Sequence, residues 1–305
     1  MDREKVLYQK RGRKKGGETV FDFGNMAMMA VLACLILYPL YFVVIASVSD
    51  PYKVAAGDVW LFPKGFTLEG YERVLSDIKL WRAYYNSFAY MITGTLINIV
   101  VTIPAGYALS RKDLKGRKIF LLIMTFTMFF SGGMIPTYLL IQNLHMENTF
   151  WAMVLPNAMA VLNVFICKTF FESNIPDALY EAAAIDGCSN FRFFFSMVIP
   201  LSKAVIMVMV LFYAIEHWNA YLDALLYLRD EDKYPLQVVL RDILMSNEVG
   251  STGMMINDDS IAKQQRIAEM IKYCVIVISN IPLLILYPFV QKYFKKGVMI
   301  GSIKG

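Results

Sequence analysis

Long apolar runs alternate with short polar segments along this chain. The first run, Met26 to Val48, is almost unbroken and long enough for a helix to cross a hydrocarbon core of about 30 Å. Five further runs share this character, each followed by a turn or a polar segment. The pattern predicts an all-α integral membrane protein with six transmembrane helices, over residues 26–48, 85–109, 119–141, 150–171, 204–228 and 267–290.

The third run carries residues that interrupt a helix. Ser131-Gly132-Gly133 and Pro136 lie in its second half. Such an interruption is tolerated in a membrane only where neighbouring protein or water satisfies the freed backbone groups. We therefore expect this span to be broken, with protein or water beside the break.

Composition and charge support a membrane location and set its orientation. Hydrophobic residues make up 57% and charged residues 18% of the chain, against about 45–50% and about 25% in soluble domains. The net charge of +5 comes from basic residues that flank apolar runs, so it does not indicate nucleic-acid binding. Lys and Arg are densest in the N-terminal tail and the loop Arg111–Lys118, which predicts cytoplasmic N and C termini.

This orientation predicts the domain organisation. Residues 84–290 are expected to form a core domain of five spans, interrupted by an inner polar segment (172–203) and an outer one (229–266). The outer segment is expected to hold a short helix at Leu236–Met245. The other expected parts are a cytoplasmic tail (1–25), the first span (26–48), an external segment (49–83) with a short helix around Tyr71–Leu75, and a cytoplasmic C-terminal tail (291–305).

The sequence offers no metal, cofactor or catalytic site. His145 and His217 are far apart, and the four cysteines form neither a zinc-ligand pattern nor a disulfide framework. No G-x-x-x-x-G-K-[ST] phosphate loop is present, so we expect that the chain does not bind ATP by itself. It also lacks a convergent set of nucleophile and base, which argues against an intramembrane enzyme.

The inner segment 172–203 predicts a short amphipathic helix on the cytoplasmic surface. Pro176 suits the first turn of a helix, and Gly187 suits its end. Ala178 and Ala182 would share one face, and their small side chains would let another backbone approach closely. The residues alone leave an ordinary surface helix between two spans equally open.

A spacing pattern in this segment resembles a known family. Glu181-Ala182-Ala183 is followed by Gly187 and then by Met197, Ile199 and Pro200. This pattern resembles the EAA loop of permease subunits of ABC importers. Met197 and Ile199 stand where that family usually has Ile and Leu, which is a mild departure.

Other stretches resemble narrower branches of the same family. Trp218-Asn219, Tyr234–Gln237 and Gln291–Phe294 are similar to the carbohydrate-uptake branch with maltose-type permeases. Ser131–Tyr138 is similar to a subgroup linked to import of complex oligosaccharides and polysaccharides. The resemblance covers nearly the whole chain apart from the basic N-terminus.

The resemblance implies a non-catalytic permease in the bacterial plasma membrane, which forms half of a translocation pathway for carbohydrate. The implied partners are a sister permease in a heterodimer, two ATPase subunits that bind ATP and Mg²⁺, and an external solute-binding protein. Membrane lipid surrounds the spans. The residues implied to contact the ATPase are Glu181, Ala182, Ala183, Asp186, Gly187 and Pro200, and in the tail Gly301, Lys304 and Gly305.

Polar residues within the fifth span are a second candidate site. Glu216 and Asn219 are three residues apart and would face alike, whereas Trp218 points elsewhere. These three residues could line the translocation path, or they could form hydrogen bonds between helices that fix the bundle. Asp223 is expected to lie near the outer surface and meet water. An alternative function, a proton-coupled secondary transporter that uses Glu216, would require an inverted repeat that we do not find.

Overall fold

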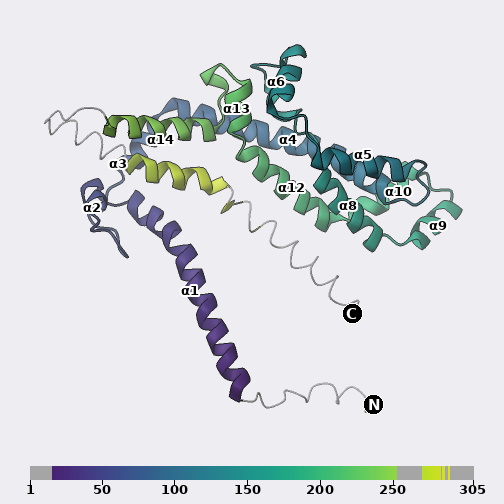
Figure 1. Cartoon of the computed structure of the whole chain (residues 1–305), viewed down its shortest axis with the longest axis horizontal. Helices are drawn as coiled ribbons and strands as arrows, with labels where there is room; N and C mark the ends of the chain where they lie inside the picture. The colour runs from purple at the N-terminus through teal and green to yellow at the C-terminus, as the bar shows by residue number, and fades with distance from the viewer. Residues whose placement is uncertain (1–15, 253–269, 283, 286–287, 289–305) are drawn as a thin grey trace. The chain divides into compact units, whose positions relative to one another are not determined.

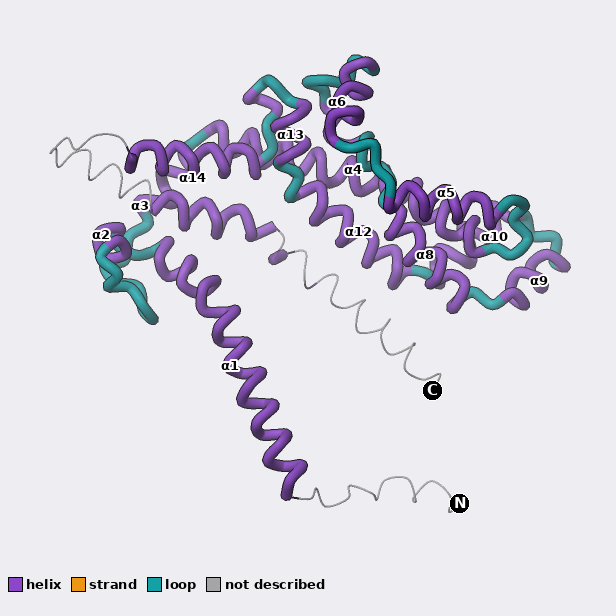
Figure 2. Tube along the Cα trace, viewed as in Figure 1, coloured by secondary structure: helices purple, strands orange, loops and turns teal. Residues whose placement is uncertain are grey.

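The computed structural model describes residues 16–252, 270–282, 284–285 and 288, and every regular element among them is a helix (Figures 1 and 2). The chain divides into two compact units. One comprises residues 1–70 with 257–277, and the other comprises residues 71–256 with 278–305. The predicted all-α class is therefore confirmed for the described residues.

The first unit is built on α1 (Gly16–Ser47), most of which is exposed from Phe21 to Tyr41. The last turn of α1 is buried instead, and it contacts residues 270–277 of the same unit. There the thiol of Cys274 donates a hydrogen bond to the carbonyl of Ser47 at 3.3 Å. An apolar helix that is exposed along most of its length is suited to a lipid environment. The short helix α2 (Pro51–Ala55) follows, and Asp50 caps it by accepting a hydrogen bond from the Tyr52 amide.

The second unit is organised around α4 (Ile78–Ser110), which packs along α12 (Lys203–Trp218) and α8 (Val161–Asn174). Two glycines of α4 allow these helices to approach closely. A Cβ atom at Gly94 would lie 2.3 Å from Nε2 of His217, and one at Gly106 would lie 2.6 Å from Cβ of Cys167. Neither position has room for a larger residue unless its neighbour moves.

Several predicted spans are not single straight helices. The third is broken as expected: α5 (Arg117–Phe129) and α6 (Met134–Asn143) meet at 110°, with Gly133 at φ 88° between them. Pro136 lies in the first turn of α6 and causes no break of its own. The fourth is interrupted at residues 155–160, between α7 (Phe150–Val154) and α8, and this break was not predicted.

The fifth predicted span is also divided. Its main part is α12, and the short helix α13 (Leu222–Tyr227) follows after a turn. Before it, α10 (Asn190–Phe193), a π-helical turn (Phe194–Val198) and α11 (Ile199–Leu201) meet α12 at 80°. By length and composition, two described helices can cross a membrane, Phe21–Ser47 and Ile78–Ser110, or up to four if each bent pair is one span. The count of six is thus not confirmed, and part of the sixth predicted span lies outside the described residues.

Three shorter helices complete the described chain. The short helix expected around Tyr71–Leu75 is present as α3 (Glu69–Ser76). The helix predicted in the inner polar segment is α9 (Asp177–Ile185), and the helix predicted at Leu236–Met245 is the longer α14 (Leu236–Thr252).

Candidate functional site

The helix α9 begins and ends where the sequence indicated. Pro176, predicted in the first turn, occupies the N-cap position in an extended conformation, so the helix begins one residue later at Asp177. At the other end, the Asp186 amide donates to the carbonyls of Ala182 and Ala184, and Gly187 then turns the chain at φ 72°. A Cβ at Gly187 would meet nothing within 4 Å, so this left-handed conformation, not crowding, favours glycine there.

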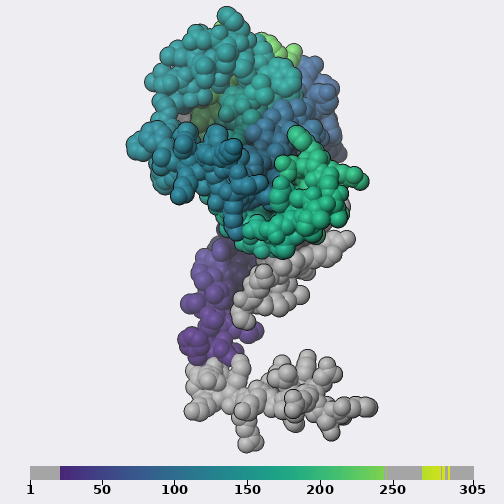
Figure 3. Space-filling view, turned by 90° about the vertical axis from the view of Figure 1, so that its right-hand side faces the viewer, coloured from purple at the N-terminus to yellow at the C-terminus, as the bar shows by residue number. Residues whose placement is uncertain are grey.

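One face of α9 is packed and the other is open. Ala183 is buried, with Leu179 and Tyr180 half-buried beside it against the cluster around Phe193. The opposite face is exposed, and Ile185 alone has 87% of its surface accessible. The other exposed residues of α9 and its C-terminal end include Ala178, Glu181, Ala182, Asp186 and Gly187. Figure 3 looks onto this end of the second unit, at whose surface α9 lies.

The loop after α4 holds α9 in place. The Arg111 guanidinium lies over the Tyr180 ring, 3.4 Å from its centroid. The Lys112 ammonium pairs with the Asp177 carboxylate at 2.7 Å, which lowers the pKa of Asp177 below its usual value. On its far side Tyr180 donates a hydrogen bond to Oδ1 of Asn190 at 3.0 Å. These contacts attach α9 to the loop at the C-terminal end of α4.

Arg117, the first residue of α5, binds the ends of both α4 and α8. Arg117 donates to the carbonyl of Leu109 at 2.7 Å and pairs with Glu172. Glu172 in turn accepts a bond from Lys168 at 2.8 Å, one turn earlier in α8. A cavity of about 160 Å³ lies between the end of α4, the end of α8 and the start of α9. Arg111 and Lys112 line this cavity, and so does Glu172, the partner of Arg117.

The remaining predicted coupling residues are placed in part. Pro200 is exposed in α11, immediately before the 80° bend into α12. The tail residues Gly301, Lys304 and Gly305 lie outside the described residues.

The polar residues of α12 divide between its surface and its core. Glu216 and Asn219 are both exposed. Trp218 is buried: its ring lies edge-on to Phe88 at 5.2 Å, and its indole N–H donates to the carbonyl of Ser279 at 3.2 Å. This arrangement favours a role in helix packing over a place in the translocation path for Trp218. It leaves Glu216 and Asn219 as the candidates for the path.

A buried polar network behind this surface was missed by the sequence reasoning. Nε2 of His217 lies 2.9 Å from Oδ1 of Asn98, and the Asn98 amide donates to the carbonyl of Asn157 at 2.7 Å. One turn away, the Tyr213 hydroxyl pairs with the Thr102 hydroxyl at 2.7 Å and accepts the Ala160 amide at 3.2 Å. The network therefore satisfies backbone groups that the break at residues 155–160 leaves free.

The environment of Asp223 corrects another prediction. Asp223 was expected only to meet water. Its carboxylate is half-buried and accepts a hydrogen bond from the Asn157 amide at 3.0 Å. Asn157 thus joins α13 to the buried network through its side chain and its carbonyl.

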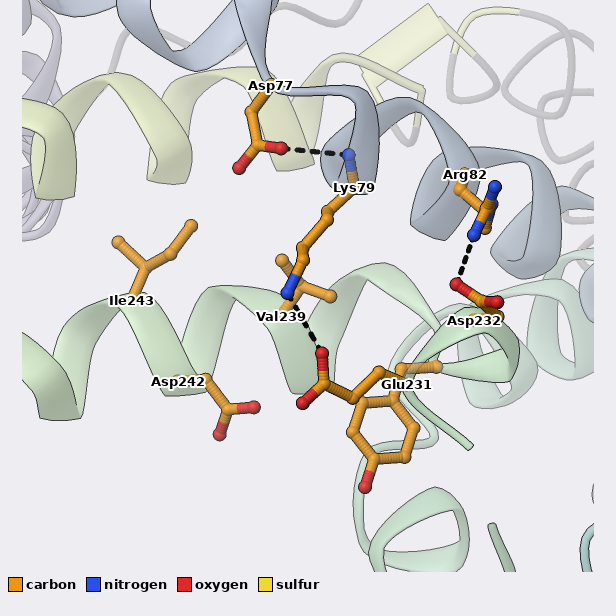
Figure 4. A pocket seen from close by; sticks show the side chains of 9 residues that line it. Asp77, Lys79, Arg82, Glu231, Asp232, Val239, Asp242 and Ile243 are labelled. Carbon is orange, nitrogen blue, oxygen red and sulfur yellow. Dashed lines mark hydrogen bonds and ion pairs between the residues drawn. The ribbon is translucent and has the colours of Figure 1, made fainter. Parts of the chain in front are cut away.

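The opposite end of α4 borders a larger cavity of about 330 Å³, shown in Figure 4. Lys79 pairs with Glu231 at 2.9 Å, and Arg82 pairs with Asp232. The Asn86 amide donates to the carbonyls of Asp232 and Tyr234. The loop after α13 is therefore attached to α4.

Asn148 fastens the same loop from the other side. It adopts a left-handed conformation at φ 56°, and its Oδ1 accepts the amides of Arg229 and Asp230 at 3.1 and 3.2 Å. Its Nδ2 donates to the Asp230 carboxylate at 2.8 Å, and its carbonyl accepts Lys233 at 2.7 Å. Asn tolerates this conformation better than most residues, which is the only signal that the sequence gives for the role of Asn148.

Comparisons with known proteins give a consistent result. Residues 79–246 match the family described as binding-protein-dependent transport system inner membrane component. Protein LplC of Bacillus subtilis (strain 168) is 38% identical, over 94% of this chain and 95% of that protein. The polygalacturonan/rhamnogalacturonan transport system permease protein YtcP of the same organism is also 38% identical, over 94% and 99%.

A solved structure supports the fold. A crystal structure of a bacterial ABC transporter involved in the import of the acidic polysaccharide alginate contains a chain that superposes with a TM-score of 0.83. The two chains are 31% identical, and the match covers 92% of this chain and 99% of that one.

Proposed function

Since this chain belongs to the family of binding-protein-dependent transport system inner membrane components, we propose that it is the permease of a bacterial ABC importer for oligosaccharides or polysaccharide fragments. As a member of this family it is a non-catalytic, integral membrane subunit. Relatives named for polygalacturonan, rhamnogalacturonan and arabinooligosaccharide transport support a carbohydrate substrate. The binding protein and the sister permease also contribute to the selectivity for an individual sugar.

In this proposal, α9 receives force from an ATPase subunit. The observation that carries it is the exposed face with Glu181, Ala182 and Ile185, on a helix whose other face is anchored to α4 through Arg111 and Lys112. Small side chains on the exposed face let a partner approach closely, and the anchors pass the movement to the membrane helices. ATP and Mg²⁺ bind to the ATPase, and a sister permease supplies the other half of the pathway.

The test is sugar uptake driven by ATP in vesicles that contain the complete importer. Gly187→Leu forces an unfavourable left-handed conformation at the end of α9. We expect uptake to be lost while the subunit still inserts into the membrane at normal levels. The matched control is Gly132→Leu, which changes a glycine at the break between α5 and α6 whose φ is not positive. Normal uptake by Gly187→Leu would contradict the coupling role of α9.

Family membership does not favour the alternative of a proton-coupled transporter that uses Glu216. The proposal predicts that Glu216→Gln still supports uptake that requires ATP. It also predicts that a protonophore leaves this uptake intact in vesicles supplied with ATP. Loss of uptake in both experiments would instead support proton coupling.

A further inference from the structure

A compact loop follows α2 in the first unit and returns along α1. This loop, residues 57–65, turns at Gly57 (φ 75°) and Gly65 (φ 70°). Two backbone hydrogen bonds close its base: the Asp50 amide donates to the carbonyl of Lys64, and the Thr67 amide donates to the carbonyl of Val48, both at 3.0 Å. The loop is therefore a folded element with a defined tip.

The tip turns its large apolar side chains outward. Trp60, Leu61 and Phe62 have 69%, 60% and 76% of their surface exposed, while Val59 is turned inward with 3% exposed. Three adjacent large apolar residues on the outside of an ordered loop indicate an interaction surface. The exposed apolar side chains of α1, such as Leu37 and Leu40, extend the same kind of surface along the helix.

The polar groups of the tip are bound within the unit. The Tyr38 hydroxyl donates to the carbonyl of Trp60 at 3.4 Å, and the Tyr41 hydroxyl donates to the carbonyl of Leu61. The indole N–H of Trp60 donates to the carbonyl of Gly57 at 2.6 Å. These bonds reduce the cost of moving the tip out of water, because an unpaired carbonyl or indole N–H is penalised there.

The same bonds fix the height of the tip along α1. Tyr41 and Tyr38 precede Ser47, the last residue of α1, by six and nine positions. At a rise of 1.5 Å per residue, the tip lies about 9–14 Å back from the end of the helix. The tip is therefore level with the apolar span Phe21–Ser47 instead of lying beyond it.

We propose that the 57–65 loop inserts its tip into the lipid bilayer, at the interfacial layer of the leaflet where α1 ends. The charge pattern makes this the outer leaflet. Lipid is the occupant because the tip continues the exposed apolar surface of a membrane-spanning helix, and because Trp and Tyr favour this layer. Lys53 and Lys64, both exposed beside the loop, are placed to meet lipid phosphates. The proposal rests on α1 crossing the membrane and does not depend on the transported sugar.

Tryptophan fluorescence of the complete importer in phosphatidylethanolamine–phosphatidylglycerol vesicles tests this proposal. The vesicles carry lipids brominated either near the headgroup or near the chain end. We expect headgroup-proximal bromine to quench the importer, and we expect Trp60→Phe to lose a clear part of that quenching. The matched control, Trp218→Phe, removes a buried indole with 1% exposure and should leave lipid quenching unchanged. The contribution of each tryptophan is the difference in quenching between its variant and the unchanged importer, so the other tryptophans can stay in place.

Aqueous iodide distinguishes the other environments. If the part of the emission that Trp60→Phe removes is quenched by iodide and not by brominated lipid, the loop lies in water and the proposal is wrong. If neither agent quenches it, another subunit covers the tip, and the proposal is equally wrong. A spin label on Phe62→Cys gives an independent reading, since lipid insertion predicts contact with oxygen and protection from a water-soluble nickel complex.

Discussion

At the scale of single residues, the contact of Arg111 with Tyr180 offers a direct test of how α9 acts. A cation–π pair at a surface site contributes about 0.5–1 kcal/mol. We therefore expect Tyr180→Leu to lower the ratio of sugar taken up to ATP hydrolysed by about two- to five-fold. Uptake and hydrolysis would be measured together in proteoliposomes.

Arg111→Lys is the matched control for this test, because it keeps a cation over the ring and should preserve most of the ratio. A fall in both uptake and hydrolysis, with their ratio unchanged, would show that Tyr180 supports only folding or assembly. That outcome would show that the Arg111–Tyr180 contact does not take part in coupling ATP hydrolysis to sugar uptake.

Substitutions at Asn148 can separate two contributions to stability, the strain of its left-handed backbone and the hydrogen bonds of its side chain. Asn148→Gly keeps the left-handed backbone available but loses the bonds to Arg229 and Asp230. At about 0.5–1.5 kcal/mol for each net hydrogen bond, we expect a lower thermal unfolding midpoint of the purified complex. The measurement is a melting curve in detergent.

His145 supplies the control for Asn148, since it also has a positive φ, at 55°. His145→Gly relieves a similar backbone conformation and should leave the melting midpoint unchanged or raise it. If both glycine variants melt alike, the bonds of Asn148 contribute no net stability.

At the scale of elements, close packing of α4 against α12 predicts the effect of one added methyl group. A Cβ at Gly94 would lie 2.3 Å from Nε2 of His217, so Gly94→Ala must displace the imidazole and strain its bond to Asn98. Overpacking of this kind costs about 1–3 kcal/mol. We expect a lower melting midpoint for Gly94→Ala.

The double variant Gly94→Ala/His217→Ala tests the cause. Truncation of His217 makes room for the new methyl group, so Gly94→Ala should cost much less in that background than in the unchanged protein. Equal costs in the two backgrounds would show that the imidazole is not what restricts residue 94.

The elements also show what the sequence could and could not predict. The ends of α9 and the break after α5 were predictable, because Pro176, Gly187 and Gly133 act locally on the backbone. The break at residues 155–160 was not, because side chains from distant helices satisfy its backbone groups. Asn98 and Tyr213 have no neighbours in sequence that reveal this role. Polar residues in apolar runs indicate that a buried hydrogen-bond network exists, but they do not show which groups are bonded to each other.

At the scale of the whole molecule, the proposed importer requires that this chain bind an ATPase subunit through the exposed face of α9. Ile185 is 87% exposed there, on a folded helix end beside Gly187. Burial of such an exposed apolar side chain against a partner contributes about 1.5–3 kcal/mol of favourable binding free energy when the burial is complete. Ile185→Asp should therefore weaken binding of the ATPase by about ten-fold or more.

Co-purification of the ATPase with this chain from detergent-solubilised membranes measures that binding. Ser173→Asp is the matched control, because it places the same charge on an exposed position near the end of α8 and away from the open face of α9. We expect Ser173→Asp to retain the ATPase and Ile185→Asp to lose it, with both variants present in the membrane at normal levels. If the ATPase stays bound to the Ile185→Asp variant, the open face of α9 is not the surface through which this chain binds the ATPase subunit.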